Sequence, residues 1–138
     1  LRTNCTLTKL FLDSNGIGPE SACEIALALQ QNISLTFLGL GNNNFGEAVS
    51  EIANSLETNT VLQKLDLSRN FIPNEAASAF SKAMESNSSL TYLSLDDNEF
   101  TDAGAKELAE GLQNNKSLTF LNLEQNEIRE EGARAFAN

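Results

Sequence analysis

Leucines and asparagines recur along the chain at fixed intervals. Five segments share the pattern L-x-x-L-x-L-x-x-N, in which x is any residue, and a further apolar residue follows two positions after each asparagine. The segments start 27 or 28 residues apart, at Leu7, Leu35, Leu62, Leu90 and Leu118. A fixed period of this length is typical of a repeat protein, here with five similar units.

Each unit contains two hydrophobic rhythms. The L-x-L core alternates with period two, which predicts a short strand with its leucines on one face. These strands are expected at residues 9–12, 37–40, 64–67, 92–95 and 120–123. Later in the unit, apolar residues recur three or four positions apart, as at Val49, Ile52, Ala53 and Leu56, and this spacing predicts a helix with one inward face.

Polar residues mark both ends of the expected helices. Acidic residues that the helix dipole favours lie at or near the helix starts, namely Glu20, Glu47, Glu75 and Glu131. After the last helical turns, where asparagine tolerates a left-handed cap, come Asn32, Asn59, Asn87 and Asn115. The repeat therefore predicts both boundaries of each helix.

Strand and helix units of this kind bury their leucines only against neighbouring units. Strands stack about 4.8 Å apart and helices about 8 to 10 Å apart, so the array is expected to bend with its strands inside. The expected fold is an α/β solenoid, a curved horseshoe with parallel strands on the concave face and helices on the convex face. The ninth residue of each unit has an amide that satisfies backbone groups where the strand turns away. This expected asparagine ladder consists of Asn15, Asn43, Asn70, Asn98 and Asn126.

The repeated motif resembles the leucine-rich repeats, and the unit length is similar to that of the ribonuclease-inhibitor-like subclass. The ninth position is asparagine in all five units, whereas the ribonuclease inhibitors carry cysteine at many of these positions. In that respect the chain is more similar to the repeat regions of NOD-like receptors and Ran GTPase-activating proteins. The resemblance implies that a protein partner binds to the concave face and its rim.

Composition narrows the classes of function. The 138 residues suffice for one domain, and they include 19 acidic residues, 9 basic residues and no histidine. A net charge of -10 argues against binding of nucleic acid or of an anionic membrane. Without histidine, and with only Cys5 and Cys23, the usual zinc sites and the histidine-based catalytic arrangements cannot be built. We therefore expect a binding protein that uses no cofactor and is not an enzyme.

The two ends of the chain share the phase of the repeat. Residues 1–7 match residues 29–35, which places the first residues in the last turn of a preceding helix, and the chain stops inside the fifth helix. We expect residues 1–138 to form a single leucine-rich repeat array that is a fragment of a longer one. Because the first residues do not make a signal peptide, we expect reduced thiols and a cytoplasmic protein. Self-association is expected through uncapped faces that expose Leu7, Leu10, Leu12, Ile128 and Phe136.

Function is expected where the units differ. The third and fifth positions of each motif point to the concave face, and several of them are aromatic or charged. Exposed aromatic side chains rimmed by charges mark interaction surfaces. The candidate partner-binding residues are Lys9, Phe11, Phe37, Lys64, Asp66, Arg69, Tyr92, Asp96, Asp97, Phe120, Asn122 and Glu124.

The charges of this face differ between its two halves. The first three units include the cations Lys9, Lys64 and Arg69 alongside Asp13 and Asp66, whereas the strands and turns of the last two units carry acidic residues and no cation. We therefore expect a protein partner with a basic patch opposite the C-terminal half.

Two other functions stay open. The chain could be a GTPase-activating repeat domain, as its resemblance to the Ran regulators implies, with Arg69 as the residue to test. The alternative for Arg69 is a solvated charge beside Asp66. The array could also be a structural spacer within a larger protein. No metal site is expected, because the acidic turn at residues 96–99 lacks the spacing of a calcium loop.

Overall fold

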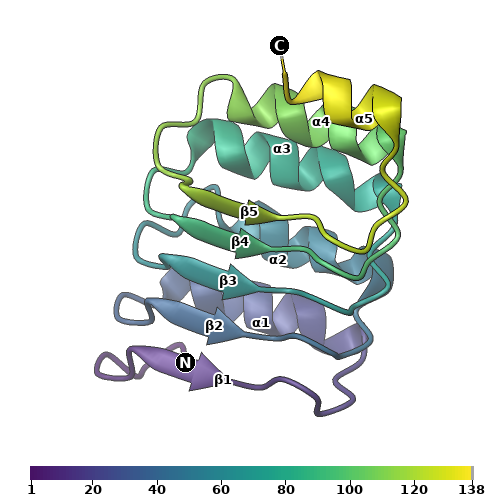
Figure 1. Cartoon of the computed structure of the whole chain (residues 1–138). Coiled ribbons are helices and arrows are strands. Elements are labelled where there is room, and N and C mark those ends of the chain that lie inside the picture. Colours follow the sequence, from purple (N-terminus) through teal and green to yellow (C-terminus); the bar gives the residue numbers. More distant parts are fainter. Residues whose placement is uncertain (138) are drawn as a thin grey trace.

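The computed structural model describes residues 1–137, in which one strand and helix unit occurs five times (Figure 1). The strands are β1 Lys9–Phe11, β2 Phe37–Gly39, β3 Lys64–Asp66, β4 Tyr92–Ser94 and β5 Phe120–Asn122. The helices are α1 Glu20–Gln31, α2 Val49–Ser55, α3 Ala77–Ser86, α4 Asp102–Leu112 and α5 Glu130–Ala135. Short 3-10 turns, Gly46–Ala48 and Asn74–Ala76, precede α2 and α3.

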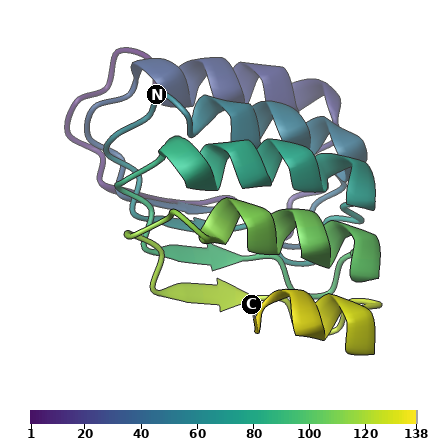
Figure 2. The ribbon, with the colours of Figure 1, turned by 90° about the horizontal axis from the view of Figure 1, so that it is seen from above.

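Within residues 1–137 the strands form one parallel sheet in the order β1-β2-β3-β4-β5. Its register places the central leucines of the five strands side by side. The helices cover one face of this sheet and pack against one another in chain order (Figures 1 and 2). The predicted solenoid is confirmed, and the concave face below means the sheet face turned away from the helices together with the turns that directly follow the strands.

Each strand ends one residue earlier than the sequence predicted. The reason is visible at Leu40, which still donates its N–H to the carbonyl of Asp66 at 2.9 Å. The carbonyl of Leu40, however, accepts from the side-chain amides of Asn43 and Asn70 rather than from a strand N–H. The backbone therefore leaves the sheet at this leucine.

The core lies between the sheet and the helices. Central leucines such as Leu38, Leu65 and Leu93 are fully buried, and the predicted inward residues Val49, Ile52, Ala53 and Leu56 are buried as well. The first and last units are less well covered: Leu7 is 38% exposed and Phe136 is 40% exposed. Leu10, Leu12 and Ile128 are partly buried. The array thus buries its apolar residues between neighbouring units, as expected.

The ninth-position asparagines satisfy the backbone where the strands turn away, as predicted. The amide of Asn43 donates to three carbonyls, and its Oδ1 accepts from the N–H groups of Asn15 and Ile17. Oδ1 of Asn98 likewise accepts from Asn70 and Ile72 in the preceding unit, at 2.9 and 3.1 Å. The ladder therefore joins each unit to its neighbour through buried or partly buried hydrogen bonds.

Asn70 departs from this pattern. Its Nδ2 donates to three carbonyls, but its buried Oδ1 has no hydrogen-bond partner within residues 1–137. The second unit spans 27 residues from its first leucine to that of the third unit, whereas the other such intervals are 28 residues. At this junction the backbone N–H of Gly46 donates to the carbonyl of Asn70. At the other junctions the backbone N–H of a unit's tenth residue donates to the carbonyl of the eleventh residue of the preceding unit, as Glu99 does to Ile72. The following residue, Phe71, has a left-handed backbone with φ 55°.

A second asparagine ladder lies where the helices end. The predicted left-handed caps are wrong, because Asn32 and Asn87 are extended, with φ -77° and -76°. In this conformation Oδ1 of Asn32 accepts the N–H groups of Ser34 and Leu35. Its amide donates to carbonyls of the preceding unit, at Leu1 and Asn4. Corresponding bonds are made by Asn59, Asn87 and Asn115.

Two side chains near the helix starts cap the helix of the next unit. Oδ1 of Asn74 accepts the N–H groups of Thr101 and Gly104 at the start of α4. Asp102 does the same for Arg129 and Gly132 at the start of α5. These two backbone donors hold the pKa of the Asp102 carboxyl below its usual range.

Candidate protein-binding face

The parallel register brings the third positions of the five motifs into one row across the sheet. Lys9 lies beside Phe37, Phe37 beside Lys64, and the row continues through Tyr92 to Phe120. In each strand the central leucine points into the core, so the residues on either side of it project to the opposite face. The structure therefore gathers the candidate strand residues on the concave face, as the alternation predicted.

Four aromatic rings form two pairs on this face. The ring centroids of Phe11 and Phe37 lie 4.7 Å apart with the rings tilted by 36°. Tyr92 and Phe120 are stacked, with centroids 4.4 Å apart and an interplanar angle of 5°. Phe11 is 63% exposed and Phe120 is 46% exposed, although both rings are apolar. Paired, exposed rings at two places on one face are unusual for side chains that serve the core alone.

Lys64 lies between the two aromatic pairs. Its Nζ atom is 6.0 Å from the centroid of the Tyr92 ring, at the limit of a cation–π contact. The stem of Lys64 thus crosses from β3 toward the C-terminal aromatic pair. The resulting row combines two lysines with three aromatic side chains, so it offers both apolar area and charge to a partner.

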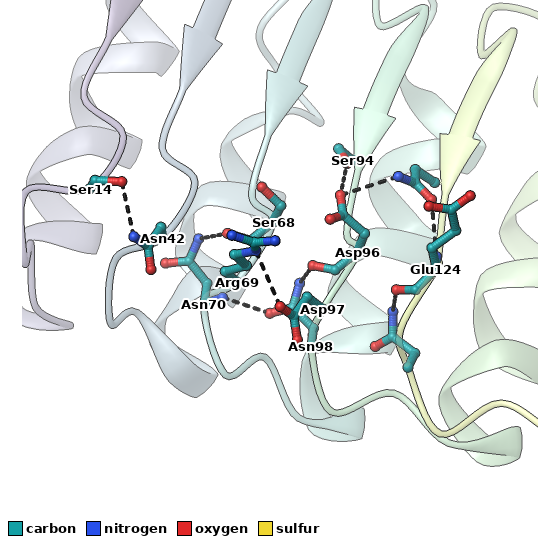
Figure 3. Close-up of polar contacts among 12 residues, drawn as sticks. Ser14, Asn42, Ser68, Arg69, Asn70, Ser94, Asp96, Asp97, Asn98 and Glu124 are labelled. Atoms are coloured by element: carbon teal, nitrogen blue, oxygen red, sulfur yellow. Dashed lines mark hydrogen bonds and ion pairs between the residues drawn. The ribbon is translucent and has the colours of Figure 1, made fainter.

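Carboxylates are fixed by hydrogen bonds at the C-terminal ends of the strands, as Figure 3 shows for Asp96. Asp66 accepts from the backbone N–H and the hydroxyl of Ser68, at 2.9 and 2.7 Å. Asp96 accepts from the hydroxyl of Ser94 and, at 3.2 Å, from the amide of Asn122. Each of these bonds uses Oδ1 and leaves Oδ2 without a hydrogen bond inside residues 1–137. These carboxylates are therefore already oriented to accept a bond from a partner.

Asp13 belongs to the same edge, although it was not among the candidate residues. Its Oδ1 accepts the N–H of Gly41 at 2.8 Å. A Cβ atom on Gly39 would lie 2.5 Å from Oδ2 of Asp13, so glycine is required for this arrangement. The two glycines of the second strand and its turn were the sequence signal, because they remove the side chains that would block the carboxylate.

Arg69 and Asp97 lie on the rim beyond the strands rather than on the sheet (Figure 3). Both occupy the eighth position of the motif, where the backbone is left-handed in all five units. Arg69 is a largely exposed charge, and its ion-pair partner is Asp97 rather than Asp66, with Nε 3.2 Å from Oδ2 of Asp97. The left-handed turn directs both side chains along the rim, where residues of neighbouring units meet.

Three other features of the described residues bear on function: metal-binding groups, membrane-spanning helices and cysteines. Within residues 1–137, no three histidine, cysteine, aspartate or glutamate side chains gather closely enough to hold a metal ion. In the same range, no helix is both long and apolar enough to cross a membrane. Cys5 and Cys23 are free, exposed thiols.

Comparisons with known proteins support the repeat assignment. The structure is similar to one described as "Leiomodin-1 Actin-Binding Site 2", with a TM-score of 0.79, 21% identity, and coverage of 95% of this chain and 77% of that chain. It is also similar to the tropomodulin C-terminal domain of Caenorhabditis elegans, with a TM-score of 0.80, 13% identity, and coverage of 95% and 80%.

Comparison at the level of sequence gives a match to a family model but none to an individual curated protein. No curated protein sequence matches the chain. The family model described as "Leucine Rich repeat" matches residues 3–26, 58–81, 86–109 and 114–137, which together exceed half of the chain. The matched segments coincide with repeat units that the structure stacks into one solenoid. The chain therefore belongs to the leucine-rich repeat family.

Proposed function

We propose that this array is a protein-recognition module of a receptor or scaffold and that it binds a folded protein on its concave face. The observation that supports this proposal most is the pair of aromatic contacts, Phe11 with Phe37 and Tyr92 with Phe120. Pairing holds each ring in place, so a partner would bury apolar area at little cost in side-chain entropy. Rings of this kind are common energetic anchors of protein interfaces.

The charges of the face indicate the chemistry of the partner. In the C-terminal half, Asp96 is fixed by hydrogen bonds, and Glu124 follows it in the next unit with an exposed side chain. Asp97 is paired with Arg69 on the rim. A partner with a basic patch opposite this half would meet oriented carboxylates and be attracted to them at a distance.

Actin is the first candidate partner to test. One structural neighbour is described as an actin-binding site, and the fold of this chain covers most of it. At 21% identity the two chains share their fold, so actin enters as a candidate to be measured.

Two alternatives predict different results. A GTPase-activating domain would need Arg69 to reach a bound nucleotide, and its ion pair with Asp97 would first have to break. Nucleotide hydrolysis by candidate small GTPases, with and without the protein, tests this function. A structural spacer would bind no protein on either face.

Matched surface variants test the proposal. The wild-type chain, a concave variant Tyr92→Ala/Phe120→Ala, and a convex variant Glu51→Gln/Lys106→Gln would be immobilised and offered actin and, separately, an extract of the source cells. We expect a specific partner that binds the wild type and the convex variant and is lost from the concave variant. Equal binding to all three surfaces would contradict the concave assignment.

A further inference from the structure

A surface cavity lies on the rim, outside the sheet, where the turns after β2, β3 and β4 meet. Its volume is about 260 Å³. It is lined by Asn42, Arg69, Phe71, Asp97, Asn98 and Glu99. Figure 3 shows the turns that supply Asn42, Arg69 and Asp97 side by side. The proposed binding of a partner on the sheet does not use Phe71 or Glu99, so this cavity calls for a separate explanation.

Phe71 is the unusual residue of this cavity. It occupies the tenth position of the motif, which is exposed in every unit and elsewhere holds Gly16, Asn44, Glu99 and Glu127. The Phe71 side chain is 59% exposed, so it contributes little to the core. Its left-handed backbone, φ 55°, is disfavoured for a bulky residue. A large apolar ring is thus held on the surface at a position that suits glycine or a polar residue.

The charges around this ring favour a cation. The guanidinium of Arg69 is already paired with Asp97. Glu99 is exposed, and its carboxylate has no hydrogen bond or ion pair within residues 1–137. The charged side chains that line the cavity therefore leave one negative charge uncompensated. No cation of the described chain lies over the Phe71 ring, so both the ring face and the carboxylate are open to a ligand.

We propose that this rim cavity binds an arginine side chain of a protein partner. The planar guanidinium stacks on the face of Phe71, while its paired N–H groups donate to the carboxylate of Glu99. Arginine fits better than lysine because its cation is planar, more weakly hydrated, and able to make two parallel bonds to one carboxylate. The site is separate from the two aromatic pairs of the sheet, so it stands whether or not those four rings bind a protein.

A small-molecule titration tests the site without a known partner. Amide and aromatic NMR signals would be followed while Nα-acetyl-arginine methylamide is added to the full chain. The matched lysine derivative tests a cation that is not planar. The matched norleucine derivative tests an apolar side chain that carries no charge. We expect saturable shifts of Phe71 and Glu99 with the arginine derivative, at least threefold weaker binding of the lysine derivative, and none of the norleucine derivative.

Variants separate this role from a structural one. Phe71→Gly should weaken arginine binding at least threefold yet melt close to the wild type, because glycine adopts φ 55° without strain. Glu99→Gln, which keeps the size of the side chain, should weaken it similarly, whereas Tyr92→Ala should leave it unchanged. If Phe71→Gly unfolds the chain, binding of the arginine derivative to Glu99→Gln shows whether the cavity is a ligand site or has only a structural role. Equal shifts with the norleucine or lysine derivative, or unchanged binding to Glu99→Gln, would overturn the proposal.

Discussion

Asn70 and Asn98 occupy the same ninth position in neighbouring units but make different hydrogen bonds. The amide of each donates to three carbonyls. Oδ1 of Asn98 also accepts the N–H groups of Asn70 and Ile72, whereas Oδ1 of Asn70 accepts none within residues 1–137. Replacing each asparagine with alanine therefore removes the same atoms but leaves different backbone groups unpaired.

The carbonyls in question keep other donors after either substitution. In Asn70→Ala, the carbonyl of Leu40 keeps the amide of Asn43, and that of Leu67 keeps the amide of Asn98. The carbonyl of Ser68 keeps the backbone N–H of Asn42. Asn98→Ala differs because two buried N–H groups lose their acceptor.

The expected magnitudes follow from this difference. Each unpaired buried N–H costs about 1 to 3 kcal/mol, so Asn98→Ala should lower the free energy of unfolding by about 2 to 6 kcal/mol. The repeat pattern alone predicts about 1 to 3 kcal/mol for Asn70→Ala. Because its carbonyls stay paired and its Oδ1 already lacks a donor, we expect the lower end, about 1 kcal/mol.

Urea unfolding followed by circular dichroism measures both variants against the wild type. Hydrogen exchange adds a local reading, because the amides of residues 70 and 72 should lose protection in Asn98→Ala but keep most of it in Asn70→Ala. Equal destabilisation of the two variants, or a larger loss in Asn70→Ala, would refute the reasoning.

Three further predictions concern the helix cap, the terminal units and the acidic edge. Asp102 has a lowered pKa in the folded state, so it stabilises the fold above its unfolded pKa, and this contribution disappears as the pH falls through the folded value. Asp102→Asn should keep both caps, as Asn74 does, and flatten the loss of stability below about pH 4 in acid titrations followed by melting. Exposed Leu7 and Phe136 predict concentration-dependent association in sedimentation, and a clean monomer at high concentration would count against it. Asp96→Asn/Asp97→Asn should slow partner association and reduce its salt dependence in surface binding kinetics, and unchanged rates would argue against steering.

Much of the fold could be predicted because the same pattern of apolar and polar residues recurs in five units. The alternating leucines specify the strands, and helical spacing specifies inward residues such as Val49 and Ile52, which are fully buried. The ninth-position asparagines were also recognisable, since a polar residue recurring beside apolar ones must meet backbone groups. These features depend on neighbours at fixed sequence separations, so the pattern carries them.

Other features depend on differences between units, which the shared pattern hides. The unpaired Oδ1 of Asn70 and the left-handed Phe71 arise where the shorter second unit meets the third. The asparagines after the helices match a left-handed cap equally well in sequence, but their bonds to the preceding unit require an extended backbone. For Arg69, sequence proximity suggested Asp66, whereas the stacking of units selects Asp97.

Partner binding to face-specific variants tests the central claim most directly. Affinity would be measured for a purified partner against the wild type, Tyr92→Ala, Phe120→Ala, and the convex controls Glu51→Gln and Lys106→Gln. Each aromatic change should cost roughly 2 kcal/mol or more, about a thirtyfold rise in Kd, expressed mainly as faster dissociation. The Kd of each convex control should stay within about twofold of the wild-type Kd. This change is much smaller than a tenfold change, which corresponds to roughly 1.4 kcal/mol. Normal binding by both aromatic variants together with loss of binding in the convex controls would place the site on the helices and contradict the account.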